Sequence, residues 1–505
     1  MPGKKANQGR AKSPIQRRRG MASTPGAPGA YILQTEGLLF LEEEKGCSKK
    51  VSRDSPRCSE AMSDKKNEIP GKPNVLIVVP STPQPESWWH ALFSFLGNSY
   101  RVKNVFRDAI EDNASQARGE SIVKKSETVQ RNSMADPMYN MLLSTLEKLK
   151  IKKKLRSDST ARVNELVETV MKHMKETDSF WKVKRRRTGS HYENVKISQP
   201  DEFDVMLVVP VQSVDVRSYG PEGAYYTVAL KNNPRRHLLE SFVQEDGKTI
   251  SANEMLLKFR TEVKKAVRHM EDVEVERKKR ACPAVTLWIQ GSDLRIGLDI
   301  VLGLEVHSSW PSTTQDGFMI DNWLGPKAKK NFKFEPFLLV PKYEGKGNEE
   351  MDGVCAKDTW RISFSHVEKE ILKNHSSTKT CCKTGGAHCC RKQCLKLLKY
   401  LLVQLREKHP KELSKFCSYH AKSMLFHACC QRPSDSEWVG ERLSECFQLL
   451  LQDFVGCLRD GHLPNFFIPT HNLLGSKPDK RTRGFLADLI EHEINNMFPI
   501  FQESL

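Results

Sequence analysis

Apolar residues recur at helical spacing from residue 138 onward. Over residues 138–149 they fall three or four positions apart, directly after Asp136-Pro137, an N-cap residue followed by proline at the first helical position. The same spacing resumes between Val163 and Met174, after the polar residues 157–159. We therefore predict one long, bent helix with an apolar stripe and a basic face.

Strand-like and helical patterns then follow in two blocks. The apolar composition predicts strands at 202–209, 224–230, 284–289 and 296–304, with a helix at 252–273 between them. From about residue 357 the pattern is helical, and we predict helices at 359–372, 393–407, 413–429, 441–458 and 484–496. The order predicts an α+β fold of two lobes: a mixed α/β lobe over residues 136–310, which includes the long N-terminal helix, and a mostly helical lobe over residues 311–505.

Residues 1–135 differ from the rest of this 505-residue chain. Pro, Gly and Ser recur there, no helical or strand period persists, and the first 20 residues carry seven Lys or Arg and no acid. We predict a disordered basic arm, which either binds nucleic acid or serves as a solubilising tail.

The charge of the whole chain indicates an acidic partner. Lys and Arg total 80 against 62 Asp and Glu, a formal net charge of +18, which favours nucleic acid or an anionic membrane surface. Between Glu147 and Arg187 there are 14 basic and 6 acidic residues, with the densest runs at 152–154 and 185–187. We interpret these runs as phosphate contacts rather than as a solvated face. No run approaches the ~20 apolar residues of a membrane span, and no secretory signal is evident.

Fourteen cysteines are too few for a disulfide-stapled scaffold, and ten of them lie between Cys381 and Cys457. This usage indicates a reducing compartment, and we expect the cytosol or the nucleus.

Three carboxylates have the placement of a catalytic metal site. Glu202 and Asp204 stand two apart on a predicted strand, so both project from one face, and Asp299 lies within the apolar strand 296–304. A buried carboxylate needs a cation or a strong partner, and oxygen ligands suit Mg²⁺ or Mn²⁺. The Gly189-Ser190 pair upstream supplies a small turn that can approach a phosphate. Together these features predict two-metal nucleotidyl transfer; otherwise Glu202 and Asp204 are ordinary strand-end acids.

A second metal site is predicted in the insertion 375–390. His375, Cys381, Cys382 and Cys389 supply three thiolates and one imidazole, a set suited to one tetrahedral, structural Zn²⁺. Cys390 and Cys394 remain spare ligands, and cations without acids surround the set.

These residues together resemble a known family. Gly189-Ser190-His191-Tyr192-Glu193, then Glu202-Phe203-Asp204-Val205, the segment 360–366 and the His375…Cys389 insertion are similar to the cyclic GMP-AMP synthases, cytosolic DNA sensors among the Mab-21-like nucleotidyltransferases. The similarity runs from about residue 137 to the C-terminus. It implies a bilobal nucleotidyltransferase fold with a long spine helix and a zinc loop.

The resemblance also implies the activity. It predicts an innate immune enzyme of antiviral defence that, when activated by double-stranded DNA of any sequence, converts ATP and GTP into 2′,3′-cyclic GMP-AMP and two pyrophosphates. It implies a homodimer on DNA, a cyclic-dinucleotide receptor that reads the product, and a location in the cytosol and nucleus.

The resemblance assigns roles to four groups of residues. The Mg²⁺ ligands are Glu202, Asp204 and Asp299, and the zinc ligands are His375, Cys381, Cys382 and Cys389. The nucleotide contacts are Ser190, Arg361, Ser363, Ser365, Glu368, Lys399, Ser418 and Tyr419, with the Tyr419 ring stacked on a base. The DNA contacts are Lys152, Lys153, Lys154, Arg156, Lys369, Arg391, Lys392 and Lys396. Two departures from the family, His191 in place of Tyr and Val301 in place of Thr, are expected to border the nucleotide pocket.

Three other functions remain open at this point. One is a nucleotidyltransferase that makes linear oligonucleotides, and another is a catalytically silent Mab-21-like protein that binds nucleic acid. The third is a structural zinc protein, which leaves the three carboxylates unexplained.

Overall fold

The structure is a computed structural model, and it describes residues 136–503 except 198, 232–236, 280, 292–293, 377–380, 383–387 and 476–477. The basic arm predicted for residues 1–135 lies outside the described residues. Within the described part, no helix is long and apolar enough to cross a bilayer.

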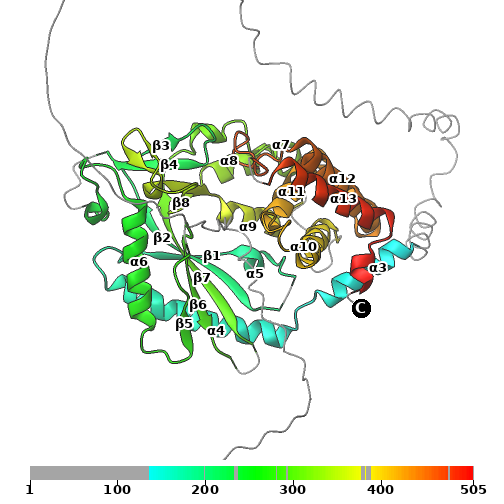
Figure 1. Ribbon diagram of the computed structural model, residues 1–505, viewed down its shortest axis with the longest axis horizontal. Coiled ribbons are helices and arrows are strands. Elements are labelled where there is room, and N and C mark those ends of the chain that lie inside the picture. The colour runs from blue at the N-terminus through cyan, green and yellow to red at the C-terminus, as the bar shows by residue number, and fades with distance from the viewer. Residues whose placement is uncertain are drawn as a thin grey trace, which may run out of the picture.

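A nine-stranded mixed sheet forms the centre of the molecule (Figure 1). Its strand order is β1-β2-β7-β8-β11-β4-β3. Strand β6 also pairs with β7, and β5 pairs with β6, while β9 and β10 form a separate two-stranded sheet. The strands are β1 Lys184–Thr188, β2 Glu202–Val211, β3 Val214–Tyr219, β4 Tyr225–Leu230, β5 Val273–Val275, β6 Ala284–Ile289, β7 Ile296–Val306, β8 Phe337–Val340, β9 Glu350–Met351, β10 Val354–Cys355 and β11 Trp360–Ser363.

Helices surround this sheet and make up most of the C-terminal part, whose helices α10 to α13 lie to one side of the sheet in Figure 1. The α-helices are α3 Pro137–Lys148, α4 Lys153–Lys175, α5 Gly189–Glu193, α6 Ala252–Val267, α7 Asp321–Leu324, α8 Pro326–Lys333, α9 Ser365–Lys373, α10 Arg391–Lys408, α11 Ser418–Gln431, α12 Leu443–Asp460, α13 Lys480–Asn495 and α14 Pro499–Glu503. This arrangement confirms the predicted fold class: a mixed sheet with helices, followed by a helical part that carries the cysteine cluster.

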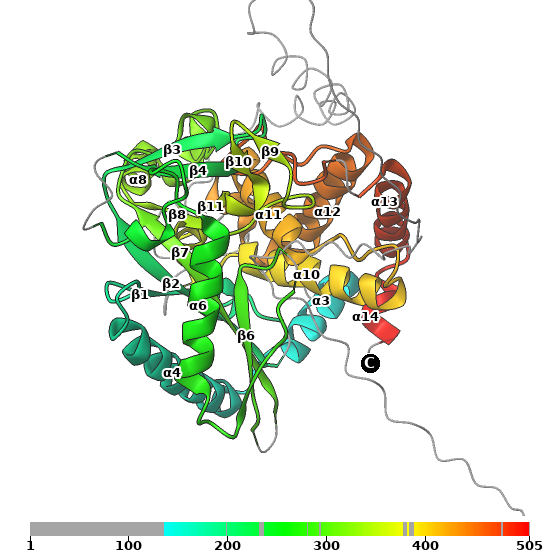
Figure 2. The same cartoon turned by 60° about the vertical axis from the view of Figure 1, so that its left-hand side comes forward.

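Strands β2 and β7 are buried on both faces, which explains their nearly continuous apolar sequence. On β2, Phe203 and Val205 face the main core, which also contains buried residues of α4 and α6, while Met206 and Val208 face a smaller apolar cluster. Figure 2 shows α6 running across the sheet with α4 beside it. The two faces therefore have different neighbours, and the face of Met206 and Val208 also carries Asp204, since residues two apart project together.

The prediction of a single N-terminal helix is wrong. The helix is interrupted between Leu149, the C-cap of α3, and Lys152, the N-cap of α4. Helix α3 packs on α10 and α12 of the C-terminal part, while α4 packs on α6. The two apolar stripes therefore pack on different sets of helices. The basic run Arg185–Arg187 lies on strand β1 and not on either of these helices.

The helix predicted at 359–372 is wrong in its first part. Trp360 and Ile362 are buried at alternate positions of strand β11, and the helix α9 begins only at Ser365. The helix predicted at 252–273 ends at Val267, and its last predicted residue belongs to strand β5. The short strands β1, β8 and β11 escaped prediction because each has only four or five residues.

Truncation of Leu166 tests the packing of α4. Leu166 is fully buried on this helix, so Leu166→Ala should lower the free energy of unfolding by about 2–5 kcal/mol in a urea titration. Lys172 is exposed on the same helix, and Lys172→Ala should change the free energy of unfolding by less than about 0.5 kcal/mol. Equal effects of the two substitutions would contradict this packing of α4.

Candidate functional site

Two of the three predicted carboxylates are neighbours on adjacent parallel strands. The register of β2 and β7 pairs Asp204 with Asp299, so both side chains project from the same face of the sheet. Both residues are buried, at 6% and 2% exposure. Thr286 on β6 stands opposite Asp299 and donates a hydrogen bond of 2.6 Å from its hydroxyl to Asp299 Oδ1. The sheet thus holds two acids side by side in a buried setting.

The third carboxylate, Glu202, is paired with a lysine. Lys196 Nζ lies 2.9 Å from Glu202 Oε2 and 3.3 Å from Asp201 Oδ1, and the Lys196 side chain is only 3% exposed. A cation that took Glu202 as a ligand would therefore compete with the Lys196 ammonium. The carboxylate donors fit Mg²⁺ or Mn²⁺ by their chemistry, since hard cations prefer oxygen.

The Gly189-Ser190 turn lies directly against Asp204. Gly189 adopts a φ of +81°, and a Cβ atom there would stand 2.1 Å from Asp204 Oδ2. Only glycine tolerates both the left-handed backbone and the close approach. Ser190 follows at the start of α5 and is buried at 6% exposure. The predicted phosphate turn and the predicted metal ligands therefore meet in one place.

Two helices, α4 and α10, donate hydrogen bonds to the segment that contains α5. From α4, Arg156 donates to Asn194 Oδ1 at 2.5 Å and to the His191 carbonyl at 3.3 Å. From α10, Lys399 Nζ donates to the Val195 carbonyl at 2.9 Å. Arg156 was predicted to contact DNA and Lys399 to contact nucleotide, and here each is bonded to the segment that follows Ser190.

His191 was expected to border the nucleotide pocket, but it lies on the other side of β2 from Asp204. Its ring lies 4.3 Å from the Phe203 ring, which projects from β2 on the side opposite to Asp204, and its Nε2 lies 3.2 Å from the Thr160 hydroxyl. Burial, with help from the nearby Arg156 and Lys196, lowers the His191 pKa to about 4, so the ring is neutral at pH 7. Val301 does lie on the Asp299 side, in the smaller apolar cluster.

The other predicted nucleotide contacts lie on four elements: Arg361 and Ser363 on β11, Ser365 and Glu368 on α9, Lys399 on α10, and Ser418 and Tyr419 on α11. The structure brings some of them into direct contact. The Tyr419 hydroxyl donates to Glu368 Oε1 at 3.1 Å, and the Ser365 hydroxyl reaches the Met206 sulfur at 3.3 Å on the carboxylate face.

The structure adds residues that the sequence analysis missed. Lys342 is buried at 3% exposure, and burial lowers its pKa to about 7, helped by the charge of Arg361. Lys196 and Lys422 are likewise buried lysines that pair with acids of this region. Within its apolar helix, Lys422 stands three residues after Tyr419, and that spacing was the signal that could have revealed it.

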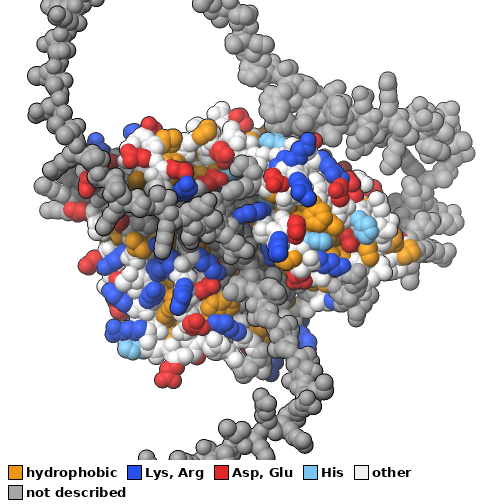
Figure 3. All heavy atoms as spheres, in the orientation of Figure 1, with side chains coloured by type: hydrophobic (Ala, Val, Ile, Leu, Met, Phe, Trp, Pro, Cys, Tyr) orange, Lys and Arg blue, Asp and Glu red, His pale blue; other side chains and the backbone are white. Residues whose placement is uncertain are grey.

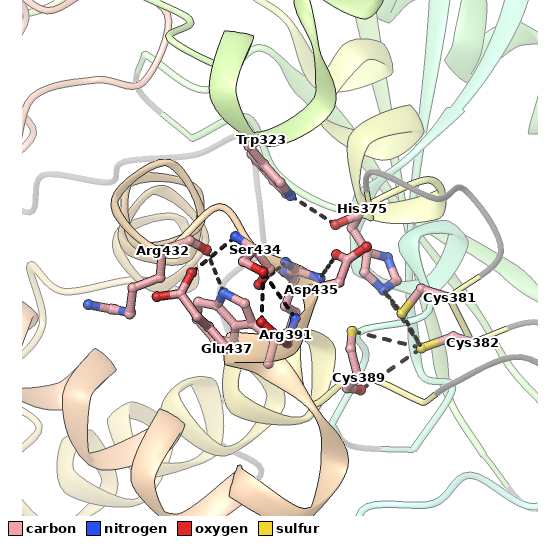
Figure 4. A network of polar contacts seen from close by, with 12 residues as sticks. Trp323, His375, Cys381, Cys382, Cys389, Arg391, Arg432, Ser434, Asp435 and Glu437 are labelled. Carbon is pink, nitrogen blue, oxygen red and sulfur yellow. Dashed lines mark hydrogen bonds and ion pairs between the residues drawn. The ribbon is translucent and has the colours of Figure 1, made fainter. Parts of the chain in front are cut away.

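The predicted zinc ligands converge. The Nε2 atom of His375 and the three Sγ atoms of Cys381, Cys382 and Cys389 all lie within 4.8 Å of one another. Figure 4 shows the four side chains gathered together. His375 Nδ1 donates to the Leu372 carbonyl at 2.9 Å, which leaves Nε2 as the ligand atom. The hydrogen bond with Cys389 lowers the pKa of Cys382 to about 2, with a second contribution from His375. The donor set fits Zn²⁺, and no other set of His, Cys, Asp and Glu gathers this closely among the described residues.

The burial of Arg391 contradicts the prediction that this residue contacts DNA. Its side chain is fully buried beside the zinc ligands and pairs with Asp435 at 2.8 Å, while its guanidinium lies over the Trp438 ring (Figure 4). A guanidinium in this position cannot reach a phosphate on the surface. Arg391 instead joins the zinc loop to the 434–438 segment, which Cys390 also contacts through a backbone hydrogen bond to Trp438.

The other predicted DNA contacts are at least partly exposed, and Lys152, Lys153 and Lys154 are the exposed ones. Lys369 donates to the Arg187 carbonyl at 3.0 Å, and burial lowers the pKa values of Lys369, Lys392 and Lys396. In Figure 3, Lys and Arg side chains gather over the part of the molecule where Figure 1 draws α4, α6 and β1.

The β1 arginines are partly engaged in ion pairs. Arg185 bonds to Glu168 and Arg186 to the buried Glu305, each at 2.6 Å. The predicted phosphate run at 185–187 therefore also stabilises the fold.

Loss of one zinc ligand tests the cluster. Purified protein should contain one zinc per chain by elemental analysis, and Cys389→Ser should lower both the zinc content and the melting temperature, because a structural metal contributes folding energy. Cys355→Ser, outside the cluster, is the control and should leave both unchanged. Equal zinc contents in the two variants would contradict the assignment of the ligands.

The sequence matches two family models. Residues 191–374 match the Mab-21 protein nucleotidyltransferase domain, and residues 390–492 match the Mab-21 protein HhH/H2TH-like domain.

Named relatives agree with these models. The chain is 46% identical over 373 residues to the cyclic GMP-AMP synthase of Sus scrofa, which covers 73% of each chain. It is 44% identical over 377 residues to the cyclic GMP-AMP synthase of Mus musculus, or 74% of this chain and 72% of the relative. A cyclic GMP-AMP synthase-like receptor of Magallana gigas is 27% identical over 352 residues, 66% of this chain and 55% of that protein. The chain therefore belongs to the Mab-21 nucleotidyltransferase family and is a nucleotidyltransferase like the cyclic GMP-AMP synthases.

Proposed function

We propose that the protein converts ATP and GTP into 2′,3′-cyclic GMP-AMP with release of two pyrophosphates, and that double-stranded DNA activates it. The observation that carries the catalytic part is the register that sets Asp204 beside Asp299, with Gly189 packed against Asp204. The names of the relatives support the identity of the product.

The chain supplies the groups for two nucleotidyl transfers. Glu202, Asp204 and Asp299 would hold the divalent ions, which supply Lewis-acid stabilisation of the charge on the reacting phosphates. The Ser190 hydroxyl and the backbone of its turn would bind the triphosphate. Tyr419 would stack on a base and position the nucleotide. A buried, water-poor setting strengthens each of these electrostatic contacts.

Activation by DNA would act through the contacts of Arg156 with the segment that contains α5. Arg156 lies next to the exposed lysines 152–154 and donates to Asn194 and His191 behind Ser190. A phosphate bound at Arg156 would compete with these two contacts, so binding along α4 would shift the position of the Gly189-Ser190 turn. The same shift would release Glu202 from Lys196 for a metal ion.

The basic surface would bind DNA through its phosphates, so binding would be independent of sequence and sensitive to salt. We also propose two copies of the protein on one duplex, a cyclic-dinucleotide receptor for the product, a role in antiviral defence, and a location in the cytosol and nucleus. The resemblance to the cyclic GMP-AMP synthases supports these assignments.

One assay tests the function. Full-length protein with ATP, GTP and Mg²⁺ should make a cyclic dinucleotide only when duplex DNA is present, as identified by chromatography and mass spectrometry. Asp204→Asn should lower synthesis by about 10²–10³-fold, because a charge at the reacting phosphates is lost, while DNA affinity is unchanged. Linear products, or equal synthesis without DNA, would refute the proposal. DNA binding without any product would indicate a silent binding protein.

Gly189 offers a second test with a matched control. Gly189→Ala would push a methyl group into Asp204 Oδ2, so synthesis should fall by about 10²-fold, the effect of a displacement near 1 Å at a reacting centre. Gly220 has a φ of +80° and nothing within 4 Å of the point that a Cβ atom would occupy, so Gly220→Ala introduces the same backbone strain without the clash. Gly189→Ala should lose more thermal stability than Gly220→Ala, because only Gly189→Ala adds a clash to the backbone strain. A similar loss of synthesis in both would show that backbone strain, and not contact with Asp204, is responsible.

A further inference from the structure

Lys422 on α11 joins three helices through one buried ammonium group. Its Nζ atom lies 2.8 Å from Glu193 Oε1 at the end of α5 and 3.1 Å from Glu368 Oε2 on α9. The Lys422 side chain is 8% exposed, and those of Glu193 and Glu368 are 1% and 4% exposed. One lysine thus bridges two acids in the interior, between the segment that carries Ser190 and the C-terminal part.

The bridge continues to the predicted base-stacking residue. The second oxygen of Glu368 accepts a hydrogen bond of 3.1 Å from the Tyr419 hydroxyl. Asn465 Nδ2 approaches the same hydroxyl at 3.4 Å. A continuous path of polar contacts therefore runs from α5 through Glu193, Lys422 and Glu368 to the Tyr419 ring.

This arrangement is costly as a means of stability alone. Two buried carboxylates share one ammonium, and a buried ion pair is often no more stabilising than apolar residues of similar size. Ala421 and Met424, close to Lys422 on α11, are buried apolar residues, and an apolar residue at 422 could have continued the core. An ionic bridge instead sets distances and angles that apolar packing would leave free.

We propose that Lys422 is a positioning residue that couples the two ends of the nucleotide site. It holds α5, with Ser190, and the Tyr419 ring in one relative arrangement, so that contacts to the triphosphate and to the base form together. The inference rests on the proposed nucleotide contacts of Ser190 and Tyr419.

The charges around the bridge determine how its loss would appear in a pH profile. Burial raises the pKa of Glu368, the Lys422 charge opposes that rise, and Glu193 adds to it. The charge of Glu193 raises the pKa values of Lys392 and Lys369, and the charge of Arg361 opposes the rise of the Tyr419 pKa that burial causes. Without Lys422 the pKa of Glu368 would rise further. Glu368 would then bind a proton at a higher pH and lose its role as a charged acceptor for Tyr419.

The test uses the full chain with duplex DNA, and compares Lys422→Met, Lys422→Arg and Glu193→Gln. Lys411→Met, at an exposed position between α10 and α11, is the control and should behave as wild type. Lys422→Met should raise KM for the nucleotides about tenfold and move the acidic limb of the pH profile upward. Lys422→Arg should recover most of both effects. Adding Glu193→Gln to Lys422→Met should cost less than the sum of the two single effects, as for groups in one network.

Direct binding separates this inference from the proposed function. In calorimetry, Lys422→Met should lower the affinity for ATP by a larger factor than the affinity for adenosine or for inorganic tripolyphosphate. The reason is that only ATP contacts both ends of the site. If wild type binds ATP but makes no cyclic dinucleotide, the proposed function fails while this comparison still tests the coupling.

Two results would overturn the inference. One is an unchanged KM and pH profile in folded Lys422→Met, or in Glu193→Gln if Lys422→Met does not fold. The other is a loss of ATP binding no larger than the losses for its two fragments, measured on whichever of these variants folds.

Discussion

The parallel pairing of β2 with β7 is the constraint on which the rest of this structure depends. Both strands are buried on both faces, so their register cannot slip by one residue without moving every side chain to the wrong side. That register alone sets Asp204 beside Asp299. Burying two acids costs free energy, and the mostly apolar residues that pair along β2 and β7 supply the stabilisation that offsets it.

Around this pair the chain places a small segment that is held from several sides. Gly189 touches Asp204, and the residues after Ser190 are bonded to α4 through Arg156, to α10 through Lys399 and to α11 through Lys422. Each bond is polar and each partner belongs to a different helix. Under the proposed activation, binding along α4 would reach the turn beside the carboxylates through these contacts.

Sequence reasoning succeeded where the chemistry is local. Glu202 and Asp204 are two apart on one strand, and three of the zinc ligands lie within nine positions of each other, so short-range spacing was enough to group them. It failed for charges whose partners are distant in sequence. Arg391 was predicted to meet DNA, yet it is buried against Asp435, 44 positions away. Lys422 reaches Glu193 across 229 positions, and no local pattern contains that information.

The sequence by itself determined the α+β class, the family resemblance and the grouping of those candidate metal ligands that are close in sequence, because strand alternation, ligand spacing and apolar periodicity are local properties. Only the tertiary structure decided which charges are available to a ligand and which are used inside the fold. Lys196 on Glu202, Arg156 on Asn194 and Lys422 between its two acids are pairings made by packing. The physical reason is that the free energy of a charge depends on its surroundings, and the surroundings exist only once distant segments are brought together.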